Sequence, residues 1–199
     1  VDRLRAEVDE AEIQRRTGAR LHTSHLPAML RWWRSAHPDV FGSVKTWMSL
    51  GEYVWLRLLG DTAAGTSTAA WAGLLDRHTG EWDAQMLDLS GIGIDQLSRI
   101  ADPDEPLHPV SNFVPRRWRT LAHVPWFPVI PDGFASSLGA GAEGPDNPVI
   151  SFSTSGAMRV IVDGAPADVP SGLWCYRLDR RRSIVGGALN DVGRMVTWM

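Results

Sequence analysis

The sequence predicts an α/β fold in which a helix-rich first part is followed by a strand-rich second part. Over much of residues 1–138 the apolar side chains recur at the spacing of amphipathic helices, whereas from residue 149 they alternate with a period of two. The segment 139–148, which is rich in glycine and proline, separates the two patterns. We therefore place a domain boundary in this segment, with residues 1–144 in one domain and residues 145–199 in the next.

Three helices are predicted at the start of the chain. The first is a charged helix over residues 1–16 that ends at Thr17-Gly18, and the third runs over residues 52–59 and ends at Gly60. The second stops before Pro38, which cannot continue a helix. Its apolar residues at positions i, i+3, i+4 and i+7 are Leu26, Met29, Leu30 and Trp33. We expect these apolar stripes to pack in the core.

Shorter elements follow in the rest of the first part. Residues 67–82 are small, apolar and turn-rich, and short helices are predicted over residues 82–89 and 95–100. Residues 102–115 contain four prolines and indicate an ordered surface connection. A compact apolar strand is then predicted over residues 127–130.

Asp132 directly follows this predicted strand and precedes a predicted small-residue helix over residues 133–138. A carboxylate at the carboxyl end of a strand lies where α/β folds place their sites, and it can take a proton from an alcohol. The alternative is an N-cap, in which the carboxylate accepts hydrogen bonds from the backbone of Phe134 or Ala135. Position alone favours the cap, although one carboxylate can serve both roles.

The second part begins with a predicted β-hairpin. Strands over residues 149–153 and 158–163 are joined by Thr154-Ser155-Gly156. Two more strands are predicted over residues 173–178 and 183–185, after which Gly186-Gly187 is expected to lead into a final helix from residue 192.

The tip of this hairpin is a candidate phosphate site. Small residues let backbone N–H groups approach a phosphate, and the hydroxyls of Ser153, Thr154 and Ser155 add donors. Arg159 adds positive charge a few residues later. The same residue types also populate hairpin turns for conformational reasons alone, so the pattern by itself does not decide between the two interpretations.

Composition excludes several classes of function. A net charge of −3, with arginines mostly scattered, gives no basic face for nucleic acid, and no apolar run is long enough to cross a membrane. The six histidines lack the spacing of metal ligands, so we predict no zinc site. His22 and His25 are expected to be solvated loop residues, and the tryptophans to lie in the core. The lone Cys175 fits a reducing compartment, so we expect a cytoplasmic protein.

Taken in order, these patterns resemble the FGGY family of carbohydrate kinases over nearly the whole chain, and the opening Thr17-Gly18 with His22 most resembles the gluconate kinase branch. The matching segments are Thr17-Gly18 with His22, Trp32, His37-Pro38, Met48 to Gly60, Gly73 to Asp76, Trp82-Asp83, Phe127 to Gly133, Leu138 to Gly141, Ser153 to Arg159 and Gly186 to Asn190.

The resemblance implies two domains of the actin-like, ribonuclease-H-like ATPase fold. Residues 1–144 would be the later part of the sugar-binding first domain, and residues 145–199 the start of the ATP-binding second domain. Asp132 would be the general base and, with Gly133, would contact the sugar. The turn of Thr154, Ser155 and Gly156 would approach the phosphates of ATP bound with Mg²⁺. The implied substrate is a small sugar or sugar acid, with gluconate favoured.

The sequence also departs from the family pattern. The family's N-terminal phosphate loop and distal adenosine motif are absent from these residues, so the chain by itself is expected to be an inactive fragment of a longer kinase. Met29 stands where lysine is usual, and Pro131, Ser153 and Val192 stand where glycine is frequent. These changes leave a second hypothesis open, a diverged non-catalytic sugar-binding or interaction module. Exposed sheet edges are expected to favour homo-oligomers.

Overall fold

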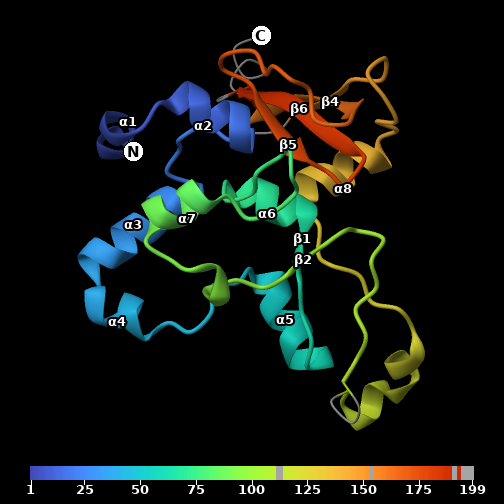
Figure 1. Cartoon of the computed structure of the whole chain (residues 1–199). Coiled ribbons are helices and arrows are strands. Elements are labelled where there is room, and N and C mark those ends of the chain that lie inside the picture. The colour runs from blue at the N-terminus through green and yellow to red at the C-terminus, as the bar shows by residue number, and fades with distance from the viewer. Residues whose placement is uncertain (111–113, 153–154, 190–191, 194–199) are drawn as a thin grey trace.

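The computed structural model describes residues 1–110, 114–152, 155–189 and 192–193. Figure 1 shows a four-stranded sheet at the top, with α6 and α8 beneath it and α1, α2, α3 and α7 to one side. The elements in chain order are α1 (Asp2–Glu7), α2 (Glu10–Thr17), α3 (Leu26–Ala36), α4 (Pro38–Ser43), α5 (Leu50–Leu59), β1 (Ala64–Gly65), α6 (Thr66–Ala72), α7 (Ala84–Ser90), η1 (Ile94–Gln96), β2 (Ile100–Ala101), η2 (Arg116–His123), α8 (Asp132–Gly139), β3 (Val149–Phe152), β4 (Gly156–Asp163), β5 (Trp174–Arg177) and β6 (Arg182–Leu189).

The predicted first helix is two helices. Asp9 caps the second of them, α2, because its carboxylate accepts hydrogen bonds from the backbone nitrogens of Ala11 and Glu12. The chain is extended at Val8, where α1 has ended. Gly18 then ends α2 in the left-handed conformation, as predicted. A single continuous helix over residues 1–16 was therefore wrong at its middle and right at its end.

The predicted second and third helices are confirmed as α3 and α5. α3 stops before Pro38, which instead begins α4 at the position where a missing N–H costs nothing. α5 starts with a capping box, in which Ser49 accepts from the Glu52 nitrogen and Glu52 accepts from the Ser49 nitrogen. It ends at Gly60 in the left-handed conformation.

Three predictions for the middle of the chain need correction. Residues 67–82 were predicted as turn-rich, but residues 67–72 belong to helix α6, and of the predicted helix over residues 95–100 only residues 95 and 96 are helical, in η1. Residues 127–130 pair in no strand ladder in the described part of the chain. Pro128 and Pro131 have no N–H to donate, and the carbonyls of Phe127 and Val129 accept from the side chains of Trp55 and Thr68. The segment is held by side chains in place of a sheet.

The second part forms an antiparallel sheet with the strand order β3-β4-β6-β5. The predicted hairpin is confirmed, with Ile150 opposite Met158. β6 is longer than predicted, so Gly186 and Gly187 lie inside this strand, while residues 192–193, at the start of the predicted final helix, are helical. A Cβ on Gly186 would lie 2.5 Å from the Trp174 ring, so glycine is needed there for the strand to pass this side chain. Thr154 and residues 194–199 of the predicted final helix lie outside the described residues.

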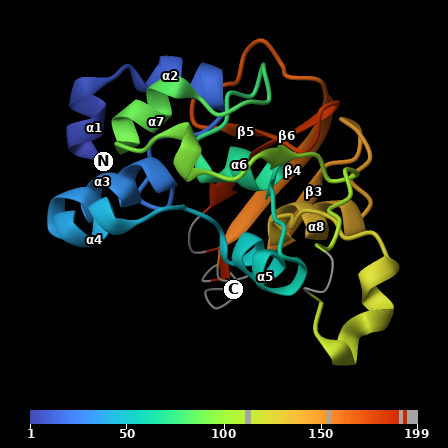
Figure 2. The same cartoon turned by 60° about the horizontal axis from the view of Figure 1, so that its bottom comes forward.

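One hydrophobic core joins residues from both sides of the predicted domain boundary. It contains Ala70 of α6 and Phe134 of α8 together with Ile161 of β4 and Ile184 of β6. A second cluster, which includes Leu4, Ile13, Leu30, Leu74 and Met86, holds the first helices and α7 together. Figure 2 shows η2, in yellow at the lower right, projecting away from α6 and β4. No helix in the described ranges has both the length and the apolar character needed to span a bilayer.

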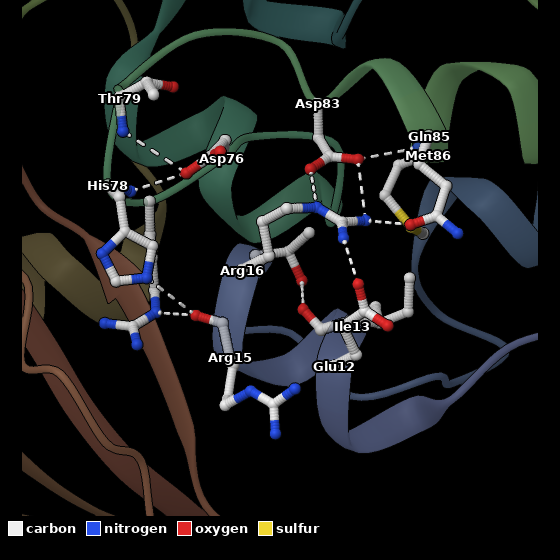
Figure 3. A network of polar contacts seen from close by, with 12 residues as sticks. Glu12, Ile13, Arg15, Arg16, Asp76, His78, Thr79, Asp83, Gln85 and Met86 are labelled. Atoms are coloured by element: carbon white, nitrogen blue, oxygen red, sulfur yellow. Dashed lines mark hydrogen bonds and ion pairs between the residues drawn. The ribbon is translucent and has the colours of Figure 1, made fainter.

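A polar network fastens α2 to the start of α7 (Figure 3). The Arg16 guanidinium donates to both carboxylate oxygens of the buried Asp83, and Asp83 also accepts from the Met86 nitrogen at 2.8 Å. Arg77, in the connection between α6 and α7, is fully buried and donates to the carbonyls of Arg15 and Pro166. The bond from the Met86 nitrogen to Asp83 caps α7. The bond from Arg77 to the Pro166 carbonyl attaches the loop before β5 to the helical part.

Candidate active site

A cavity of about 630 Å³ collects side chains from before and after the predicted domain boundary. Asp132, Ser155 and Gly156, three of the predicted site residues, line this one cavity. Gly133 is buried directly beside it, and the remaining candidate, Thr154, is not among the described residues. The lining consists of Arg5, Arg20, Leu21, His22, Ser24, His25, Trp71, Asp132, Ser151, Ser155, Gly156, Ala157, Arg159, Gly172, Trp174, Tyr176 and Ala188.

Asp132 is the first residue of α8, and its side chain is exposed to the cavity. Its Oδ1 accepts a hydrogen bond of 2.7 Å from the adjacent Gly133 nitrogen. The nitrogens of Phe134 and Ala135 donate instead to the Pro131 carbonyl, so the carboxylate does not make the predicted capping bonds. Asp132 is thus available to accept a proton from a molecule bound in the cavity.

The predicted phosphate turn enters the cavity at Ser155 and Gly156, where β4 begins. Gly156 is buried, and a Cβ there would lie 2.6 Å from Val192 and 3.2 Å from the Ser151 carbonyl oxygen. Any larger residue would move one of these neighbours. The absence of a side chain keeps the backbone close to the cavity, as phosphate binding by N–H groups requires.

Arg159 lies on β4, the strand that begins in this turn, and its side chain reaches Gly133. A Cβ placed on Gly133 would lie 3.4 Å from Arg159 Nη2 and 3.3 Å from the Trp71 ring, so both side chains reach the residue after the candidate base. Arg159 Nη1 donates to Ser151 Oγ at 3.2 Å. The guanidinium is therefore held in the cavity wall by the neighbouring strand.

Both histidines line the cavity, and His22 is an exposed loop residue as expected, whereas His25 corrects the expectation of a solvated side chain because it is half-buried. The Arg20 carbonyl can only accept, so His25 donates to it from Nδ1 at 2.7 Å. Burial lowers the pKa of His25, against the opposing effect of this hydrogen bond. The Ser24 nitrogen donates to Nδ1 of His22, so a neutral His22 carries its proton on Nε2.

Aromatic side chains form another part of the wall. Trp174 and Tyr176 of β5 stack with ring centroids 4.9 Å apart, and the Trp71 ring lies 5.2 Å from Tyr176. No tryptophan was predicted to bind a ligand, because the sequence alone does not show that Trp71 of α6 packs against β5. Aromatic faces of this kind suit the C–H surfaces of a sugar.

The described residues offer more to a phosphate than to a bare metal ion. No group of three or more His, Cys, Asp or Glu side chains within these ranges is close enough to hold a metal. Asp132 is the one carboxylate among the described residues of the cavity lining. Gly156 and the guanidinium of Arg159 fit the phosphates of a nucleotide, so Mg²⁺ would be held mainly through those phosphates.

Comparison with known proteins gives a consistent family. Residues 1–139 match the N-terminal domain of the FGGY family of carbohydrate kinases. A gluconokinase from Bacillus licheniformis is 24% identical over 197 residues, which are 99% of this chain and 38% of that protein. The chain thus spans well under half the length of this curated relative.

Solved structures share the fold. A gluconate kinase and a ligand-bound xylulose kinase, both from Lactobacillus acidophilus, superpose with a TM-score of 0.87 at 29% identity, over 99% of this chain and 40% of theirs. These structures have the actin-like ATPase fold, and this chain matches a portion of it. The names of the relatives differ in the sugar, so they agree on the class of reaction more than on the substrate.

Proposed function

This chain belongs to the FGGY family of carbohydrate kinases, and we propose that the full-length protein transfers the γ-phosphoryl group of ATP to a primary hydroxyl of gluconate or a similar sugar acid. The observation that carries the proposal is the single cavity that unites Asp132, Ser155 and Gly156 with Arg159. Phosphoryl transfer depends mainly on positioning and charge neutralisation, and these residues supply a base, a phosphate turn and a cation.

In this proposal each of the chain's residues has a defined part. Asp132 takes the proton from the sugar hydroxyl, while Gly133 leaves room for the sugar beside it. Thr154, Ser155 and Gly156 hold the phosphates of ATP through backbone N–H and hydroxyl groups. ATP bound with Mg²⁺ supplies the phosphoryl group and a metal that neutralises the phosphate charge.

The charges in the cavity favour an acidic substrate. Among the lining residues that the structure describes, Arg5, Arg20 and Arg159 are cations and Asp132 is the one carboxylate. Arg5 is paired with Glu10, whereas Arg20 makes no ion pair within the described ranges. The carboxylate of a sugar acid would accept hydrogen bonds from Arg20 and His22, which a neutral sugar would leave unused.

A steady-state assay of the full-length protein with Mg·ATP tests this proposal. We expect turnover with gluconate to exceed turnover with xylulose or glycerol. Arg20→Met and His22→Gln should each lower kcat/KM for gluconate by about tenfold, the value of one charge-assisted hydrogen bond, without a matching loss for neutral sugars. Sugar binding without any turnover would instead support the non-catalytic sugar-binding module.

We also propose that residues 1–199 alone are inactive, because the chain spans only 38% of its gluconokinase relative and part of the ATP site lies elsewhere in the protein. The purified 199-residue chain should release no ADP in response to sugar. Sugar-dependent turnover by this chain would contradict that. We further propose a cytoplasmic location and a domain boundary between residues 144 and 145. We also propose that the isolated chain self-associates, which light scattering tests.

A further inference from the structure

The guanidinium of Arg159, so far given only as a positive charge of the site, has a defined place in the cavity wall. It reaches from β4 to Gly133, 3.4 Å from where a Cβ would be, and it is anchored by its bond to Ser151 Oγ. β4 itself starts at Gly156, in the phosphate turn. Arg159 therefore comes from the strand that begins in the phosphate turn, and its guanidinium reaches the residue next to the proposed base.

The positive charge of Arg159 is not balanced within the part of the chain that the structure describes. It makes no ion pair there, and its Nε atom is buried with no hydrogen-bond partner. By contrast, Arg182 is paired with Asp179, and the buried Arg77 donates to several carbonyls. A half-buried guanidinium with an unused donor is unfavourable unless an anion binds to it.

We propose that Arg159 is a catalytic residue that binds the γ-phosphoryl group while it is transferred. This inference rests on the proposed kinase function. The sugar hydroxyl oxygen forms a bond to the γ-phosphorus as the bond from that phosphorus to the β–γ bridging oxygen breaks. The hydroxyl proton passes to Asp132, and the electron pair leaves with ADP. From its position beside Gly133, Arg159 would neutralise negative charge that is spread over the oxygens of the transferring group.

The position of Arg159 favours the phosphoryl group over the carboxylate of the sugar acid. The reacting hydroxyl must lie beside Asp132, and the phosphoryl group must lie between that hydroxyl and the turn at Gly156. The carboxylate of gluconate is separated from its primary hydroxyl by the length of the carbon chain. Arg20 and His22, which precede α3, are left to bind that end of the substrate, Arg20 as a cation and His22 as a hydrogen-bond donor.

The test is kinetic and uses the full-length protein with Mg·ATP and gluconate. Arg159→Ala should lower kcat by about 10²–10³-fold while KM for gluconate changes by less than about threefold. Added guanidinium ion should restore part of the lost kcat, an effect that a merely structural arginine would not show. Arg159→Lys should retain more activity than Arg159→Ala, because it keeps the charge but not the planar fork.

Arg181→Ala is the matched control. It removes the same charge from an exposed position on the turn between β5 and β6, so kcat should stay unchanged. Thermal melting of each variant separates misfolding from lost chemistry, and guanidinium rescue requires a folded protein.

Two other outcomes would overturn the inference. A raised KM for gluconate at unchanged kcat would assign Arg159 to the carboxylate, and unchanged kinetics would give it no role in the reaction. If the wild-type protein is active and the Arg159→Ala variant is equally active, only this inference is wrong. An inactive wild-type protein defeats the proposed kinase function and this inference with it.

Discussion

The Tyr176 hydroxyl lies 3.2 Å from Nε2 of His25, and this contact joins β5 to the loop before α3 across 151 residues of sequence. Since Nδ1 of His25 donates to the Arg20 carbonyl, Nε2 of the neutral ring accepts and the tyrosine hydroxyl donates. Burial also raises the pKa of Tyr176, so the hydroxyl keeps its proton. The cavity wall is thereby fixed by one residue from each side of the predicted domain boundary.

Tyr176→Phe is expected to lower the free energy of unfolding by about 1 kcal/mol, because it deletes one partly buried hydrogen bond and leaves the His25 acceptor without its donor. The stacking on Trp174 is retained in the variant. Urea unfolding of the full-length protein measures the change. The chain's other tyrosine provides the control, since Tyr53 is 48% exposed on α5 and Tyr53→Phe should change stability by less than about 0.5 kcal/mol. Equal effects at the two positions would contradict the role given to the contact.

His25 should make stability depend on pH in a defined direction. Its pKa in the folded protein is below the ordinary value of 6.5, so near and below that pH the unfolded chain binds more protons than the folded one. Stability should therefore fall as the pH drops through about 6.5 towards the folded pKa, and it should be fully present above it. The hydrogen bond from Arg31 lowers the pKa of Glu7, and that group acts only below its ordinary value of 4.5.

Unfolding curves at about pH 7.5 and about pH 5 measure this effect. His25→Gln should reduce the loss of stability between the two pH values. The control is His123→Gln, at an exposed position, which should leave that loss unchanged. A wild-type protein that is equally stable at both values would show that the buried ring does not control the dependence.

Local chemistry explains which parts of the fold were predictable. α5 was predicted because Glu52 and Gly60 act within the helix itself, and the hairpin was predicted because its alternation is local. The strand expected at residues 127–130 failed because Thr68 and Trp55, distant in sequence, take its carbonyls. Gly186 was wrongly placed after the end of its strand, because the Trp174 ring that requires a glycine there comes from another strand.

The same division holds for the candidate site. Asp132 and the turn at Ser155 and Gly156 have short, continuous sequence patterns that resemble a family, and they do line one cavity. His25 has no local signal, because its burial and its two hydrogen bonds depend on Tyr176 and on the path of the loop. The contact of Arg159 with Gly133 is likewise visible only once β4 is placed beside α8.

Arg16 is expected to be a major contributor to stability, whereas its neighbour Glu12 is not. Arg16→Met would leave the buried Asp83 carboxylate, 3% exposed, without its cation, which should cost about 2–3 kcal/mol of unfolding free energy. Glu12→Ala removes only the exposed 3.4 Å pair with the same arginine and should cost less than about 1 kcal/mol. Chemical denaturation of both variants gives the comparison, and similar losses would refute the assignment of the stabilisation to Asp83.

Asp132→Asn separates catalysis from capping in the full-length protein. The amide keeps the shape of the side chain and can still accept from the Gly133 nitrogen, but it cannot take a proton from the sugar. If Asp132 is the general base, kcat should fall by about 10²–10⁴-fold while gluconate still binds. Because the nitrogens of Phe134 and Ala135 donate to the Pro131 carbonyl and not to this carboxylate, the melting temperature should hardly change.

Measurement of kcat, of gluconate affinity by calorimetry and of the melting temperature on the same preparation distinguishes the two roles. An N-cap lost from α8 would cost about 1 kcal/mol of stability and leave the chemistry almost intact. A variant with near-normal kcat and a lowered melting temperature would therefore make Asp132 a structural residue. Asp146→Asn is the control, since this exposed residue lies in the linker between α8 and β3 and outside the cavity lining. It should leave all three quantities unchanged, so a loss confined to kcat at Asp132 identifies the base.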